Sequence, residues 1–126
     1  RTVVAGKPSL KQIEIYNIVL EAQIEAINAI KPGMIGSEID AIARDVIIKY
    51  GYGKYFGHGL GHGIGLHIHD SPAFSKFSSL ILEPGMICTV EPGIYIPDWG
   101  GIRIEDNILI TESGCEILTK SVKTIQ

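Results

Sequence analysis

The sequence predicts an α+β domain in which two amphipathic helices pack on a mostly antiparallel, curved sheet. Apolar side chains recur at spacings of three and four in the first part of the chain, which is typical of helices. Short runs of sheet-forming residues, separated by turn signals built on Pro and Gly, occupy the remainder. Helices first and strands later are the order of an α+β domain. A length of 126 residues suits one domain, residues 1–126.

Residues 9–30 are expected to form the first helix. Ser9 and Gln12 make a capping-box pattern at its start, and Pro32-Gly33 stops it. The expected apolar stripe consists of Ile13, Tyr16, Leu20, Ile24, Ile27 and Ile30. These positions fall on one side of a helix, so we expect that side to face the sheet.

Residues 37–50 are expected to form the second helix. Ser37 can cap its start, and Gly51 can end it in the left-handed conformation. Its expected apolar face consists of Ile39, Ile42, Val46 and Ile47. A short turn therefore joins two amphipathic helices.

The strands are expected in the later part of the chain. They span residues 86–90, 93–96, 102–110 and 116–118. A glycine-rich segment, residues 51–65, lies between the second helix and these strands and is expected to be a loop or extended chain. Much of the chain's excess of glycine, 15 residues in all, lies in this segment, so side chains around it can be approached closely.

The composition excludes two classes of function. Lys and Arg number 11 against 14 Asp and Glu, which gives a net charge of −3, whereas a nucleic-acid binder needs a basic excess. No apolar run reaches the roughly 18 residues that span a bilayer, so no membrane partner is expected. Cys88 and Cys115 lie in apolar strand surroundings and are interpreted as core residues. Two cysteines are too few for a disulfide scaffold, which favours a reducing, cytoplasmic location.

The four histidines lie close together in and just after the glycine-rich segment. They are His58, His62, His67 and His69. Imidazole titrates near neutral pH and is the commonest metal ligand. In an extended chain the first two would share one face and the last two the other, and a β-bulge could bring both pairs to one pocket. The alternative is a Gly-rich loop whose exposed histidines have no function.

Two carboxylates stand close to apolar neighbours. Glu91 follows the expected strand 86–90, and Glu105 lies inside the expected strand 102–110. A buried carboxylate is costly unless it is paired or bound to a metal. Histidine with carboxylates would suit Mn, Co, Fe or Zn better than Cu, and a carboxylate can bridge two ions. Alternatively, Glu91 is exposed at a strand end and Glu105 forms a surface ion pair with Arg103.

Four motifs and one further histidine follow in a fixed order. They are HGLGHGIGL at residues 58–66, then His69, LEPGM at 82–86, TVEPGIY at 89–95 and GIRIED at 101–106. Together they resemble the Xaa-Pro peptidases, prolidase and aminopeptidase P, of the creatinase/methionine aminopeptidase ("pita-bread") superfamily. The resemblance covers essentially the whole chain. It implies that residues 1–126 are the C-terminal portion of a metallopeptidase catalytic domain with a truncated pita-bread fold.

The resemblance also implies a ligand set. In that family a dinuclear metal centre is held by two Asp, one His and two Glu. The matching motifs imply that His62, Glu91 and Glu105 are metal ligands, with Glu105 bridging two divalent ions such as Mn, Co or Zn. The family's two Asp ligands precede the segment that Arg1-Thr2 resembles. We therefore expect them outside this sequence and expect the chain on its own to be inactive and to self-associate, as a homo-dimer or otherwise.

Four catalytic roles are implied by the same motifs. His58 and His69 resemble histidines that contact substrate or stabilise the tetrahedral species, Glu91 resembles a proton carrier, and Arg103 resembles an arginine that supports the site. His67 falls at a variable position and is given no role.

The implied function of the intact parent is that of an Xaa-Pro dipeptidase or aminopeptidase. Such an enzyme uses its metal ions to hydrolyse the bond between an N-terminal residue and proline. Its substrate would be a peptide with proline at the second position. The alternative is a non-catalytic binding module on the same fold.

Overall fold

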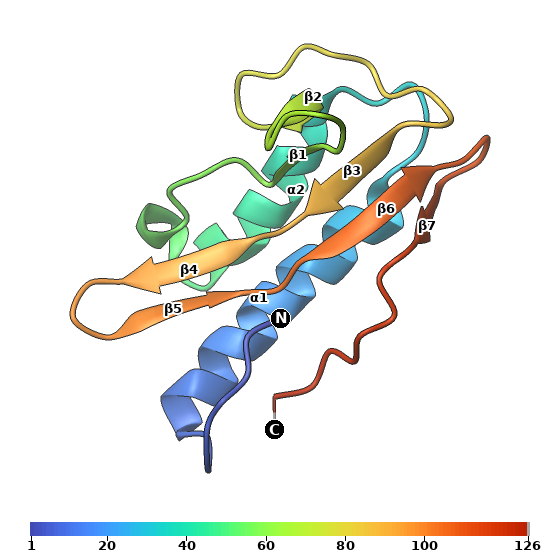
Figure 1. The fold of residues 1–126 in the computed structure, drawn as a ribbon. Helices are drawn as coiled ribbons and strands as arrows, with labels where there is room; N and C mark the ends of the chain where they lie inside the picture. Colours follow the sequence, from blue (N-terminus) through green and yellow to red (C-terminus); the bar gives the residue numbers. More distant parts are fainter. Residues whose placement is uncertain (126) are drawn as a thin grey trace.

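A computed structural model describes residues 1–125, in which two α-helices lie along one side of a β-sheet (Figure 1). The helices are α1 (Leu10–Ala29), α2 (Gly36–Lys49) and a short 3-10 helix, η1 (Gly53–Tyr55). The strands are β1 (Gly61–Gly63), β2 (Asp70–Phe74), β3 (Ile87–Val90), β4 (Gly93–Ile96), β5 (Gly100–Arg103), β6 (Asp106–Ile110) and β7 (Cys115–Ile117). The predicted order of helices and then strands is confirmed.

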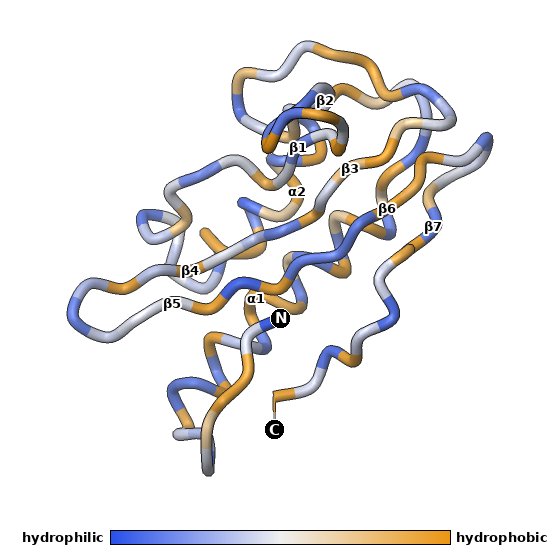
Figure 2. Tube along the Cα trace, viewed as in Figure 1, coloured by the Kyte–Doolittle hydropathy of each residue, from blue (hydrophilic) through white to orange (hydrophobic). Residues whose placement is uncertain are grey.

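The strands form two sheets within the described part of the chain. The larger has the order β2-β1-β3-β6-β7, and the smaller is the hairpin β4-β5. Every pairing between these strands is antiparallel. The core lies between this layer and the helices, and hydrophobic and hydrophilic stretches alternate along both helices (Figure 2). None of the helices in residues 1–125 is both long and apolar enough to cross a bilayer.

Helix α1 begins as its sequence predicts. The amide of Gln12 donates to Ser9 Oγ at 3.2 Å, and the amide of Ser9 donates to Gln12 Oε1 at 2.8 Å, which completes the capping box. The predicted apolar stripe is wrong at Ile24, which is 40% exposed. Tyr16, Ile27 and Ile30 of that stripe are buried, and between them the buried face runs through Gln23 and Ala26 rather than Ile24.

Helix α2 begins one residue earlier than predicted, and Ser37 is not its cap. The carboxylate of Glu38 accepts from the amide of Ile35 at 2.9 Å, so the chain ahead of the helix is held by a residue of its first turn. Gly36 lies so close to β2 that a Cβ there would be 2.1 Å from the carbonyl oxygen of Ala73. Gly51 ends the helix with φ +83°, as expected of a C-terminal glycine.

The predicted strand 102–110 is two strands, because a long hairpin is interrupted near its middle. Strand β3 leads into β4, and β5 leads into β6 (Figure 1). Pairing is lost only across Glu91-Pro92 and Ile104-Glu105, and the register is the same on both sides of the gap. Glu91 therefore lies opposite Glu105, and Pro92 lies opposite Ile104. Proline has no amide hydrogen to give to a ladder, so the gap falls where the sequence places Pro92.

One part of the glycine-rich segment, residues 61–63, belongs to the sheet as β1, and the rest consists of turns, loop and η1. Strand β1 is held between β2 and β3, and a Cβ on Gly61 would be 1.9 Å from the carbonyl oxygen of Thr89. The register between β1 and β2 shifts between His62 and Gly63, as in a β-bulge. The short, irregular pairing explains why apolar alternation did not reveal β1 and β2 as strands.

Candidate metal centre and active site

Three of the four histidines line one cavity of about 480 Å³. His58 reaches it from the chain before β1, His62 reaches it from β1, and His69 reaches it from the chain before β2. The rings of His62 and His69 meet edge to face with centroids 4.6 Å apart. His67 does not line the cavity; its side chain is 83% exposed, with Nδ1 3.8 Å from Asp70 Oδ2. The β-bulge follows His62, and histidines from both β1 and the chain before β2 line the same cavity.

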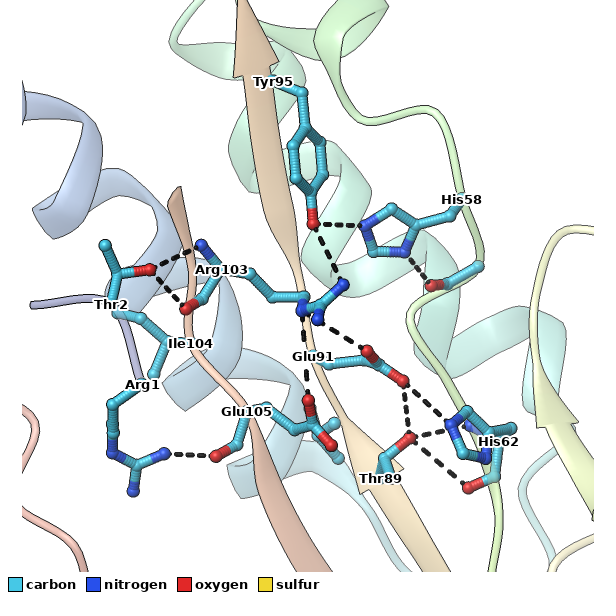
Figure 3. Close-up of polar contacts among 12 residues, drawn as sticks. Arg1, Thr2, His58, His62, Thr89, Glu91, Tyr95, Arg103, Ile104 and Glu105 are labelled. Carbon is cyan, nitrogen blue, oxygen red and sulfur yellow. Dashed lines mark hydrogen bonds and ion pairs between the residues drawn. The ribbon is translucent and has the colours of Figure 1, made fainter. Parts of the chain in front are cut away.

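Glu91 lies beside His62 in this cavity (Figure 3). Its Oε1 accepts from the hydroxyl of Thr89 at 2.9 Å and lies 3.2 Å from His62 Nε2. The Thr89 hydroxyl oxygen in turn accepts from the amide of His62 at 3.0 Å. Thr89, to which the sequence motifs assign no role, therefore links the backbone of His62 to the carboxylate of Glu91. The side chain of Glu91 is largely buried rather than exposed at a strand end.

Glu105 faces the same guanidinium group as Glu91 (Figure 3). Arg103 Nε is 3.7 Å from Glu91 Oε2 and 3.9 Å from Glu105 Oε2. Like charges directly opposite across two strands repel, and the cation between them reduces that repulsion. The pKa of Arg103 is raised, first by the phenolic oxygen of Tyr95 and then by the two glutamates, so the group stays charged. Glu105 lines a neighbouring cavity of about 260 Å³, which shares Tyr95 and Arg103 with the first.

The donor chemistry of His62, Glu91 and Glu105 fits a divalent ion, since it combines an imidazole nitrogen with carboxylate oxygens. Two of the three, His62 and Glu91, are in contact. In residues 1–125 no three His, Cys, Asp or Glu side chains are grouped closely enough to hold an ion. Glu105 is linked to Glu91 by Arg103, whose Nε lies near both carboxylates. The assignment of these three as ligands therefore stays a prediction.

Tyr95 joins His58 to Arg103. Its hydroxyl lies 3.2 Å from His58 Nε2 and accepts from Arg103 Nη1 at 3.4 Å. The Nδ1 atom of His58 lies 2.7 Å from the carbonyl oxygen of Gly59, which fixes the orientation of the ring. In the sequence, only its place at the end of the TVEPGIY motif marks Tyr95. Its position in the cavity makes it a further candidate for contact with substrate.

A buried ion pair on α2 holds the segment that carries His58. Arg44 donates from Nε and Nη2 to the two carboxylate oxygens of Asp40 at 2.8 and 2.9 Å. It also donates to the carbonyl oxygens of Phe56 and His58 at 2.8 and 2.9 Å. Asp40 accepts from the amide of Leu60 at 3.0 Å. The sequence signal for this pair is an acid and a base four residues apart among apolar helix positions.

Histidine and carboxylate side chains around one cavity of an α+β domain are typical of metal-dependent hydrolases. The chain belongs to metallopeptidase family M24, whose family model matches residues 1–112.

Several relatives of this chain are known. It is 56% identical over 125 residues to an Xaa-Pro dipeptidase of Pyrococcus furiosus, which covers 99% of this chain and 36% of that protein. The solved Xaa-Pro dipeptidase from Bacillus anthracis is 58% identical with a TM-score of 0.96, over 99% of this chain and 35% of that one. An X-Pro aminopeptidase from Thermotoga maritima is 46% identical with a TM-score of 0.94, over 98% and 35%.

These matches confirm the predicted family and the predicted helices on an antiparallel, pita-bread-like sheet. The chain spans about a third of the length of the relatives it matches. The family as such implies divalent metal ions.

Proposed function

We propose that the full-length protein carrying this chain is a metal-dependent Xaa-Pro dipeptidase or aminopeptidase. The observation that carries the proposal is the arrangement of Glu91 and Glu105 opposite each other, with His62 in contact with Glu91. Membership of a metallopeptidase family and the similarity to Xaa-Pro dipeptidases support it. The substrate would be a peptide with proline at its second position.

His62, Glu91 and Glu105 would hold divalent ions, two in number and of Mn, Co or Zn type, together with ligands from outside these residues. When bound, the ions supply Lewis acidity that activates water and polarises the carbonyl before proline. Three protein donors cannot fill the coordination of two such ions, so further donors are required.

The remaining polar residues would position substrate and protons. Glu91 Oε1, beside the Thr89 hydroxyl, can take a proton from the attacking water and pass it to the leaving amine. His69 can donate to the substrate oxygen as negative charge develops there. His58, oriented by Gly59, can contact the peptide, and Arg103 holds both glutamates in place.

The test is hydrolysis by the purified full-length protein with added Mn²⁺, measured on an Xaa-Pro dipeptide, a longer Xaa-Pro peptide and an Ala-Ala dipeptide. We expect cleavage of the proline substrates only, abolished by a chelator and absent from the 126-residue chain alone. Binding of the proline peptides without cleavage would instead identify a non-catalytic binding module. Rapid Mn²⁺-dependent cleavage by the 126-residue chain would show that its own residues complete the centre.

We further propose a cytoplasmic location and a homo-dimeric or otherwise self-associating state. Both cysteines are free, which supports a reducing compartment. Almost fully exposed apolar side chains at Leu66, Ile68 and Phe77 support association with another surface. Fractionation of the source cell and sedimentation of the full-length protein would test these two points separately.

A further inference from the structure

We propose that Gln23 is a positioning residue that sets the spacing of Glu91 and Glu105 across the gap in the long hairpin. Gln23 lies in the middle of α1 and is fully buried. The effect on metal binding rests on the function proposed above, whereas the effect on the hairpin does not.

The contacts of Gln23 single out the two glutamate positions. Its Nε2 donates to the carbonyl oxygen of Val90 at 3.0 Å and to that of Ile104 at 3.1 Å. Val90 directly precedes Glu91, and Ile104 directly precedes Glu105. One side chain thus ties together the two backbone segments from which both carboxylates project.

The hairpin needs this donor because of Pro92. The amide of Ile104 donates to the carbonyl oxygen of Pro92 at 3.4 Å, and in a regular ladder the opposite residue would return the bond. Proline has no amide hydrogen and cannot do so. The carbonyl of Ile104, on a fully buried residue, receives the Gln23 amide instead. Without it a buried carbonyl would be left unpaired, which is unfavourable.

The side-chain oxygen of Gln23 indicates that the hairpin requires the NH₂ group of this residue. Gln23 Oε1 is buried and has no hydrogen-bond partner. A residue selected only to fill the core would be apolar, since leaving a buried polar atom unpaired is costly. We therefore attribute the glutamine at this position to its two hydrogen bonds to Val90 and Ile104, which offset the cost of the unpaired oxygen.

The segment around Glu105 is held by side chains on both sides. Gln23 holds the carbonyl of Ile104, and Arg1 donates to the carbonyl of Glu105 and to Asp106 Oδ1. Figure 3 shows the Arg1 contact on the side of Glu105 away from Glu91. Because no strand ladder fixes residues 104–105, loss of either contact should let Glu105 move relative to Glu91.

The experiment replaces Gln23 in the full-length protein and measures Mn²⁺ affinity by calorimetry. Gln23→Met keeps the length of the side chain and removes the donor, and Gln23→Asn keeps an amide that is one methylene too short. We expect Mn²⁺ binding about 10–100-fold weaker for both, the usual effect of losing a group that orients metal ligands. Val19→Ala is the control, because Val19 is equally buried on α1 but has no polar contact with the hairpin.

The proposal is overturned if Val19→Ala lowers the melting temperature as much as Gln23→Met does and weakens Mn²⁺ binding equally. Gln23 would then be a core residue only. Unchanged Mn²⁺ affinity in a folded Gln23→Met protein would also overturn it. A metal-free measurement separates this from the proposed function: hydrogen exchange of the Ile104 amide, which bonds to Pro92 across the gap, should rise by at least about tenfold in Gln23→Met relative to Ile108. If the wild-type protein binds no Mn²⁺, the proposed function fails, and the exchange rates still decide the role of Gln23.

Discussion

His62 and His67 have the same side chain and lie close in sequence, yet their surroundings differ. His62 contacts Glu91 and packs on His69, whereas His67 projects into solvent beside Asp70. Composition and spacing could not separate them, because the shift of register after His62 depends on how β1 pairs with β2. Only the resemblance of the whole motif distinguished the two positions.

In the full-length protein, Glu105→Ala should be more damaging than His67→Ala. A bridging carboxylate would serve both ions, and its loss would leave their repulsion less compensated. His67 is mostly exposed and has one distant contact. The measurement is metal content and Xaa-Pro cleavage at a fixed Mn²⁺ concentration. Two metals and normal turnover in Glu105→Ala, with equal or greater loss in His67→Ala, would mean that the metal site has been placed on the wrong residues.

Cys88 should make the domain less stable in alkaline solution. Burial raises the pKa of its thiol from 9.0 to about 12. As the pH rises above 9.0 the unfolded chain loses this proton before the folded chain does, so the free energy of unfolding falls until about pH 12. Cys88→Ala should therefore lose less stability between about pH 7 and about pH 11 in urea unfolding.

Cys115→Ala is the comparison for that experiment. Burial also raises the pKa of the Cys115 thiol, but the residue is only partly buried, so the change in pH dependence should be smaller. The same pH dependence in wild type and Cys88→Ala would contradict the expected burial effect.

At the scale of single elements, α2 does more than cover the sheet. Its Asp40–Arg44 pair holds the backbone of residues 56–60, from which His58 projects. The cation of Arg44 also lies 4.1 Å from the centre of the Phe56 ring. A helix predicted from its apolar stripe thus carries a polar contact that positions part of the cavity.

Arg44→Met should destabilise the domain by about 3 kcal/mol or more, because it leaves the buried carboxylate of Asp40 without its partner. The exposed pair Lys49–Glu21, with its nitrogen and oxygen 3.7 Å apart, supplies the matched control. Lys49→Met should cost less than about 1 kcal/mol. Urea unfolding of both variants decides the matter, and similar losses would show that the Asp40–Arg44 pair contributes no more than a surface pair.

Element boundaries were predictable where local chemistry sets them. The capping box of Ser9 and the left-handed Gly51 can be read directly from the sequence, and both ends formed as predicted. The break between β3 and β4 was also predicted, because Pro92 marks it in the sequence. The matching break at Ile104-Glu105 was not, because it depends on the partner strand that carries Pro92 and on Gln23 of α1, both distant in sequence.

At the scale of the whole molecule, large apolar side chains remain in solvent on the segments that flank β2. Leu66 and Ile68 precede the strand, and Phe77 follows it; all three are almost fully exposed. Exposed apolar groups of this size favour association with another surface. The fold class, helix order and antiparallel sheet were predictable from apolar periodicity and turn residues alone. This exposed surface was not, because the burial of a side chain depends on which elements pack against it.

The 126-residue chain should self-associate as its concentration rises, and a triple variant with Leu66→Ser, Ile68→Ser and Phe77→Ser should do so less. Val122→Ser is the control, since Val122 is also exposed but lies on the C-terminal segment. Sedimentation velocity across a range of concentrations provides the measurement. A wild-type chain that stays monomeric throughout, or an equal effect of Val122→Ser, would contradict this expectation.

The unbroken register of the long hairpin also has a kinetic consequence. Pairs such as Ile94 and Ile102 are near neighbours along the chain, so hairpin closure is a local event of low contact order that takes about 1–10 μs in isolated hairpins. We expect this hairpin in the folding nucleus, with φ-values for Ile94→Ala and Ile102→Ala well above that of Ile39→Ala on α2. The reverse order would show that the helices form the nucleus. Glu91 and Glu105 would thus face each other early in folding, before the histidines from β1 arrive.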